Sequence, residues 1–271
     1  METYGFGGVP SPRDIRDYKL SAAAMQPHIY PESFLLKPVR IKNQDCQPTC
    51  TAHALASLVE FFNYQETYIN DKFSTDFIYG CRTDDDYLGE GMYLRDGLKV
   101  LQKYGDVLYD KLPGNTDVPT ARKKVFTNFD QLVIQAEPNK VNTYYKIQNI
   151  QELKHALVND GPVPAVMKWF KSATLINYVY TYPTTQVDDY HAVLIVGWDK
   201  DCLIIQNSWG KKWGKNGLFY IPISKMNEVF SEMYGVTDNQ NDVVLPKPSI
   251  KKFSFLINFI LRLVDKLFNK A

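Results

Sequence analysis

Hydrophobic residues recur at helical spacing in three segments of the first 160 residues. The most regular segment predicts a helix from about Cys50 to Tyr64, with Thr49 as its candidate N-cap. Its apolar positions are Ala52, Leu55, Ala56, Val59 and Phe62. Residues 94–104 and 150–159 show the same periodicity, so we expect amphipathic helices there as well.

The pattern changes after Gly161, where short apolar runs alternate with Gly, Asp and Lys turns. These runs predict antiparallel strands at 163–167, 191–198, 203–206 and 218–221. A helical first half and a β-rich second half indicate an α+β fold of two lobes. A cleft between two such lobes is a common place for a substrate.

The two ends of the chain differ from this middle region. Residues 1–28 are rich in Gly, Pro and charge, which predicts an extended arm. We expect the arm either to block a cleft as a short pro-segment or to pack as a strap on the back of the domain. Residues 239–249 predict a linker, and 250–271 an amphipathic C-terminal helix for a membrane surface, a partner protein or the domain itself.

Composition narrows the classes of function. The 271 residues include 31 Lys and Arg against 30 Asp and Glu, so the net charge of +1 gives no argument for a nucleic-acid partner. The first twenty residues have no apolar signal core, and four scattered cysteines do not describe a disulfide scaffold. These features predict a cytoplasmic or intracellular protein with mostly reduced thiols, although a Cys46–Cys81 disulfide stays open.

Three short stretches carry candidate chemistry: Asn43–Ala52, His191–Trp198 and Gln206–Gly210. Cys50 follows a Pro-Thr pair at a predicted helix start, where the helix dipole favours the thiolate that attacks carbonyls. His191 can exchange the proton, and the Asn207 amide can orient the imidazole.

Together these residues resemble the papain family of cysteine peptidases. Gln44 lies six residues before Cys50, and His191 lies 141 residues after it, within the family's usual range of roughly 130–150. Asn207 begins the family's Asn-Ser-Trp-Gly stretch. Thr51 follows the nucleophile where many members have Trp, which is closest in pattern to bacterial-type members. The resemblance covers the chain from about Tyr30 to Asp238.

The resemblance implies hydrolysis of protein or peptide substrates through a Cys50 thioester, as an endopeptidase, with Gln44 in the oxyanion hole. It also implies a papain-like peptidase domain over 29–238 and no cofactor or metal. The implied substrate-binding residues are Gly91, in a glycine-rich wall, and Tyr93, Val166 and Tyr190 in a pocket for an apolar side chain.

Other interpretations of the same residues remain. A catalytically idle binding module could keep the papain fold, although all three catalytic positions are retained here. His53 is more readily explained as a hydrogen-bonded interior histidine than as a catalytic one, and His155 as an exposed residue. Cys81 and Cys202 are expected to be small core residues. A metal site at Cys46, Cys50 and His191 lacks a completing ligand pair.

Overall fold

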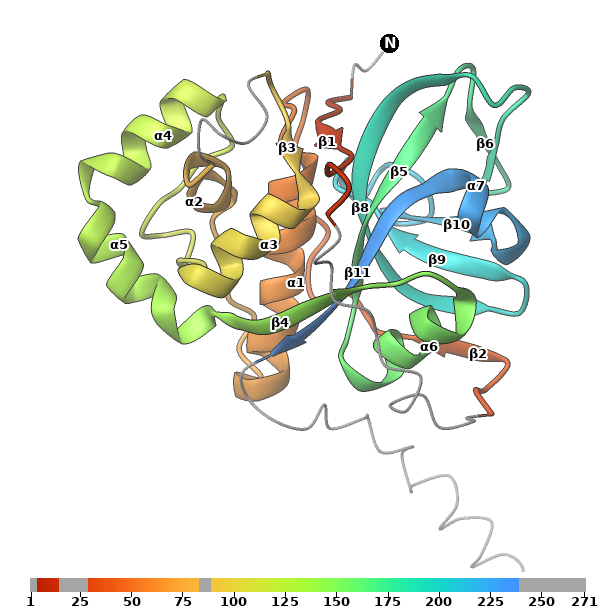
Figure 1. Cartoon of the computed structure of the whole chain (residues 1–271), viewed down its shortest axis with the longest axis horizontal. Coiled ribbons are helices and arrows are strands. Elements are labelled where there is room, and N and C mark those ends of the chain that lie inside the picture. Colours follow the sequence, from red (N-terminus) through yellow and green to blue (C-terminus); the bar gives the residue numbers. More distant parts are fainter. Residues whose placement is uncertain (1–3, 15–28, 83–88, 239–271) are drawn as a thin grey trace, which may run out of the picture. The chain divides into compact units, whose positions relative to one another are not determined.

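The computed structural model describes residues 4–14, 29–82 and 89–238 (Figure 1). Contacts divide the chain into one unit of Met1–Asn241 and another of Asp242–Ala271, and every described residue belongs to the first unit. The predicted linker at 239–249 and the predicted C-terminal helix at 250–271 lie outside the described residues, as does the arm from 15 to 28.

Residues 50–139 are mainly helical, which agrees with the predicted helical first half. Helix α1 spans Cys50–Thr67, three residues beyond the predicted end, and α3 spans Leu94–Lys103. The region also contains α2 (Thr75–Gly80), α4 (Val118–Thr127), α5 (Phe129–Ala136) and a 3-10 turn at Glu137–Asn139. Thr49 stands at the N-cap position, but its hydroxyl donates to Asn115 Oδ1 rather than capping the helix.

The second half forms a nine-stranded, mainly antiparallel sheet. Its strand order is β4 (Val141–Lys146), β11 (Phe230–Asp238), β5 (Val163–Phe170), β8 (Val187–Asp199), β9 (Cys202–Gln206), β10 (Leu218–Pro222), β7 (Val179–Thr181) and β6 (Thr174–Ile176). Strand β2 (Ser33–Leu35) pairs with β8. The helices of this half are α6 (Ile150–Asn159), a 3-10 turn at Ile223–Lys225 and α7 (Met226–Val229).

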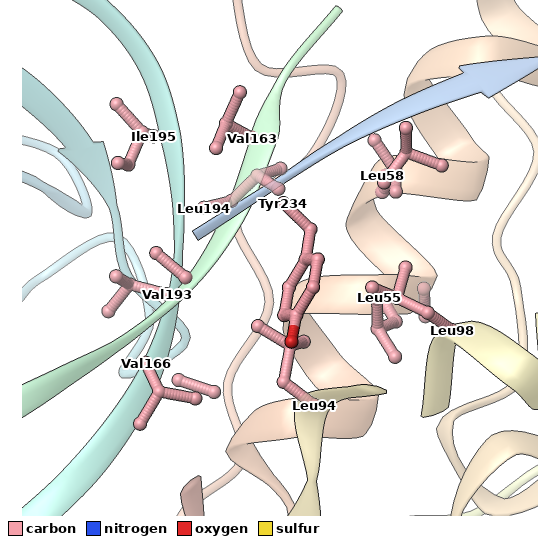
Figure 2. Close-up of a cluster of buried hydrophobic side chains, with 14 of the residues drawn as sticks. Leu55, Leu58, Leu94, Leu98, Val163, Val166, Val193, Leu194, Ile195 and Tyr234 are labelled. Carbon is pink, nitrogen blue, oxygen red and sulfur yellow. The ribbon is translucent and has the colours of Figure 1, made fainter. Parts of the chain in front are cut away.

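The core lies where α1 packs against the sheet. Every α1 residue from Cys50 to Phe62 is buried, so this helix has no solvent-facing side over its first three turns. Figure 2 shows leucines of α1 and α3 gathered near Val193 and Leu194 of β8, with the Tyr234 ring between the two groups. This packing brings the first residue of α1 beside the middle of β8.

Several details differ from the expectations. Cys46 and Cys81 carry free thiols, so no disulfide joins them in this structure. Cys46 is exposed and Cys81 is buried, whereas Cys202 is only partly buried. His155 is half-buried rather than exposed, with its Nδ1 at 3.2 Å from Asn159 Nδ2.

Candidate active site

Cys50 opens α1 and is fully buried, at 0% exposure. Its Sγ accepts a hydrogen bond from the backbone N–H of Ala192 at 3.3 Å, although 142 residues separate the two in sequence. The helix N-terminus supplies partial positive charge at the sulfur. The thiol and the start of the apolar segment of β8 therefore meet, as the sequence pattern predicts.

His191 lies one residue before Ala192 and is oriented by Asn207. The imidazole Nε2 is 2.7 Å from Asn207 Oδ1, an acceptor, so Nε2 carries the proton. The opposite nitrogen, Nδ1, is buried and has no hydrogen-bond partner among the described residues. That nitrogen is left as the one available for proton exchange. Trp209 stacks on the imidazole with ring centroids 4.5 Å apart and shields the His191–Asn207 hydrogen bond from water.

The amide of Gln44 is held in one orientation by the Asn-Ser-Trp-Gly stretch. Gln44 N–H donates to the Ser208 carbonyl at 2.8 Å, and the Ser208 hydroxyl donates to Gln44 Oε1. Because Oε1 is occupied, the Nε2 donor is directed elsewhere, to the carbonyls of Gln47 at 2.7 Å and Gly5 at 3.0 Å. Ser208 thus positions the side chain that the sequence assigns to the oxyanion hole.

The Gly5 carbonyl belongs to the N-terminal arm, and the described part of the arm crosses this site. Residues Gly8–Val9 form β1, which pairs in parallel with β3 (Met92–Tyr93). Met92 N–H donates to the Gly7 carbonyl at 2.9 Å. Phe6 packs edge-on against His191 and Trp209, with centroid distances of 5.7 and 5.5 Å. This part of the arm lies in the cleft rather than on the back of the domain.

Glycines allow the backbone of the arm to lie close to the segments that carry Cys50 and His191. A Cβ on Gly7 would lie 2.1 Å from the Pro48 carbonyl oxygen, and one on Gly8 would lie 2.5 Å from the Ala192 nitrogen. Gly91, at φ +103°, would bring a Cβ to 2.7 Å from the Gly7 oxygen. Any larger residue at these positions would push the arm away from Cys50 and His191.

A second contact holds the arm farther along. The backbone N–H and the hydroxyl of Ser11 both donate to Glu232 Oε1, at 3.1 and 3.0 Å. Arg95 Nη1 donates to the Pro12 carbonyl at 2.7 Å. Glu232 lies opposite Val166 in the β11–β5 pairing, beside the predicted substrate pocket. The sequence pattern does not single out this carboxylate, because β11 also contains Ser231, Thr237 and the acidic Asp238.

Burial favours the neutral forms of both Cys50 and His191. Loss of hydration raises the pKa of the Cys50 thiol to about 12, against the lowering effect of the Ala192 hydrogen bond. Burial likewise lowers the pKa of His191 to about 4, against the Asn207 hydrogen bond. Both groups are therefore neutral at pH 7 in this structure. His53 is also buried and neutral, and its Nδ1 bonds the Thr49 carbonyl at 2.9 Å, as an interior histidine would.

The predicted substrate-binding residues lie around the arm. Gly91 and Tyr93 belong to the wall that pairs with β1, and Tyr93 lies opposite Val9. Val166 is buried on β5 opposite Ala192, and Tyr190 lies two residues before Ala192 on β8. Side-chain alternation places Val166 and Tyr190 on the same face of the sheet.

Among residues 4–14, 29–82 and 89–238, no group of three or more His, Cys, Asp or Glu side chains could hold a metal ion, the Cys46, Cys50 and His191 set included. The same residues contain no helix long and apolar enough to cross a membrane.

A thiol at a helix start, beside a central strand that carries an Asn-oriented imidazole, is the arrangement expected of a papain-like cysteine peptidase. The family model described as papain family cysteine protease matches residues 34–239, most of the chain. This protein belongs to that family.

Relatives of this chain occur in plants and in viruses. The probable cysteine protease RDL3 of Arabidopsis thaliana is 24% identical over 238 residues, covering 83% of this chain and 61% of its own length. The uncharacterized peptidase C1-like protein L477 of Acanthamoeba polyphaga mimivirus is 27% identical over 200 residues, covering 64% of this chain and 61% of its own length. The chain thus spans 61% of each of these curated relatives.

The same fold occurs in a solved bacterial structure. Xylellain, a cysteine protease from Xylella fastidiosa, is similar with a TM-score of 0.74 and 26% identity, over 88% of this chain and 98% of its own. Plant, viral and bacterial relatives therefore all resemble the chain.

Proposed function

We propose that this protein hydrolyses peptide bonds in proteins or peptides through a Cys50 thioester. The observation that carries the proposal is the convergence of four side chains from separate segments: Cys50, His191, Asn207 and Gln44. A merely structural role for these groups would not require a buried imidazole Nδ1 without a partner among the described side chains.

The proposed reaction proceeds by acyl transfer. Cys50 Sγ, after giving its proton to His191 Nδ1, attacks the scissile carbonyl carbon and forms a tetrahedral oxyanion. Gln44 Nε2 and the Cys50 backbone N–H stabilise that oxygen. The imidazolium protonates the leaving amine, and the neutral imidazole then removes a proton from the water that hydrolyses the thioester.

Substitution of the nucleophile tests this proposal. Cys50→Ala and Cys50→Ser should abolish hydrolysis of peptide substrates, because neither side chain offers a thiolate. Circular dichroism and thermal unfolding should remain close to those of the unsubstituted protein. Unchanged turnover in Cys50→Ala would refute the assignment. An idle binding module, the alternative function, would show no turnover in either protein.

We further propose an endopeptidase rather than an exopeptidase, closest to the bacterial-type members because of Thr51. The path of the arm supports endopeptidase activity. The segment from Tyr4, which stacks on Trp209, to Pro12, which accepts a hydrogen bond from Arg95, continues on both sides of Cys50 and His191. A cleft open at both ends can take the interior of a longer chain. Comparable cleavage of a peptide with both termini blocked tests this, and cleavage restricted to free termini would contradict it.

The arm itself is proposed to inhibit the enzyme until it is removed or displaced. In support, the Gly5 carbonyl uses the Gln44 Nε2 donor that a substrate oxyanion would need, and Phe6 covers His191. A substrate cannot enter while these contacts persist. Activity of the full chain should therefore be well below that of a chain starting at Tyr30. Equal rates would discard inhibition.

The specificity pocket is proposed to favour an apolar or aromatic residue two positions before the cleaved bond. Tyr93, Val166 and Tyr190 support an apolar wall, whereas Glu232 beside Val166 adds a carboxylate at one side. A peptide library compared in Glu232→Gln and the unsubstituted enzyme measures how far that carboxylate admits hydrogen-bond donors. A strong preference for Asp at this position would contradict the assignment.

A further inference from the structure

A second hollow lies on the other side of the Gln44 loop and holds none of the catalytic groups. Its volume is about 500 Å³, and the residues lining it include Arg40, Lys42, Lys72 and Lys211. This volume is within the range of small-molecule sites, roughly 300–1,000 Å³.

Backbone hydrogen bonds fix the segments that carry three of these cations. Gly210 N–H donates to the Lys42 carbonyl at 2.9 Å, so Lys211 follows directly on a segment that pairs with Lys42. In the segment of Lys72, Tyr109 N–H donates to the Lys72 carbonyl at 2.7 Å. Lys72 Nζ lies 3.2 Å from the centre of the Tyr109 ring, which keeps the amine beside that ring.

The floor of the hollow connects to the candidate oxyanion donor. Asn115 accepts from the Thr49 hydroxyl at 2.7 Å, and its Nδ2 donates to the Gln44 carbonyl at 2.8 Å. Asn115 also lines the hollow. An occupant would therefore border the Gln44 loop from behind, without touching Cys50.

The charges around the hollow are not balanced. Glu60 bonds Lys42 Nζ at 2.6 Å and lies 3.5 Å from Arg40 Nε, so one buried carboxylate serves two of the cations. Asp45 is the one carboxylate among the lining residues, and it accepts from Asn43. Four cations against these two carboxylates leave an excess of two positive charges.

The two cations that Glu60 does not contact, Lys72 and Lys211, are exposed to solvent. Within the described ranges, neither Lys72 nor Lys211 forms a salt bridge, and both side chains belong to exposed residues. The positive charge also affects His53, another residue that lines the hollow. Burial is the main cause of the lowered pKa of His53, and the charges of Lys42 and Lys72 lower this pKa further. Uncompensated cations in a concave surface attract anions more strongly than the same cations on a flat one.

We propose that this hollow binds a small multivalent oxyanion, with phosphoryl oxygens held between Lys72 and Lys211. Lysine is a common phosphate ligand because its ammonium carries three donors and a compact charge. The proposal does not depend on peptidase activity, since it concerns a different set of side chains.

Isothermal titration calorimetry of the full chain with inorganic pyrophosphate tests the proposal. We expect one saturable site, weakened at least about tenfold by Lys72→Glu and by Lys211→Glu. Lys171→Glu is the matched control: Lys171 is also exposed, makes the same change in net charge and does not line the hollow. Its affinity should stay within about twofold of the unsubstituted protein.

Two results would overturn the proposal: no saturable heat up to about 10 mM pyrophosphate, a range that covers even weak sites, or equal weakening by all three substitutions. Acetylation of lysines in the unsubstituted protein gives a measurement that needs no variant. Pyrophosphate should protect Lys72 and Lys211 from acetylation and leave Lys171 reactive. Uniform reactivity with and without pyrophosphate would contradict binding at this hollow.

Discussion

Gly7→Ala should activate the full-length protein. The added Cβ would lie 2.1 Å from the Pro48 carbonyl oxygen and 2.5 Å from its carbonyl carbon, and both are backbone atoms next to the catalytic helix. Neither can move away without shifting the segment that leads to Cys50. The strain would therefore be relieved by partial or complete release of the arm.

The size of the effect follows from the steric overlap. Overpacking of this kind costs typically about 1–3 kcal/mol. Displacement also endangers the Met92–Gly7 hydrogen bond of 2.9 Å, worth about 1 kcal/mol. Since about 1.4 kcal/mol is a factor of ten, the overpacking alone should raise the fraction of open molecules by roughly fivefold to 150-fold.

The assay is the initial rate of cleavage of a fluorogenic peptide by the full chain, compared with a chain starting at Tyr30 as the upper limit. Arg13→Ala is the matched control because Arg13 is exposed in the same arm. Its rate should equal that of the unsubstituted chain. A Gly7→Ala rate unchanged from the unsubstituted chain, with folding intact, would refute the reasoning that this arm closes the site.

Other predictions concern separate parts of the chain. Asn207→Ala should lower kcat yet leave residual turnover, because the imidazole loses its orientation while the thiol remains; complete loss equal to Cys50→Ala would contradict a positioning role. Burial raises the pKa of the Asp106 carboxyl, so the folded protein keeps a proton on this group at pH values where the unfolded chain has lost it. The free energy of unfolding therefore falls as the pH rises toward the folded-state pKa. Asp106→Asn, which cannot ionise, should gain stability relative to the unsubstituted protein in urea unfolding as the pH rises above about 4, the pKa of an unfolded aspartate; a difference that is constant with pH would count against it. If residues 250–270 bind membranes, the intact chain should co-sediment with anionic liposomes and a chain ending at Asp242 should not.

Strong periodicity explains which elements the sequence could predict. The helix at 150–159 and the strands from 163 to 221 have regular apolar positions and clear turn residues, and the structure has elements there, with β8 extending from 187 to 199. Helices α4 and α5 were not predicted. Only Val118, Ala121 and Val125 are buried in α4, and three consecutive basic residues at 122–124 interrupt its apolar pattern.

The candidate site was predictable in part for a similar reason. Cys50, His191, Asn207 and Gln44 can be identified from local motifs, because the residue type and its spacing in the sequence are both characteristic at each position. Glu232 and the position of the arm depend on contacts between residues far apart in the sequence, such as Ser11 with Glu232, which are 221 positions apart. A glycine-rich segment is compatible with a cleft and with an exposed surface alike, so its composition does not predict where the arm lies.

Covalent labelling tests the central claim most directly. A thiol-directed epoxide should modify Cys50 selectively and rapidly in a chain starting at Tyr30, slowly in the full chain, and slowly again after His191→Ala. Peptide mass spectrometry identifies the modified residue, and the exposed Cys46 serves as an internal reference for an ordinary thiol. Labelling of Cys46 at a rate equal to or above that of Cys50 in the chain starting at Tyr30 would contradict an activated Cys50 and the peptidase mechanism built on it.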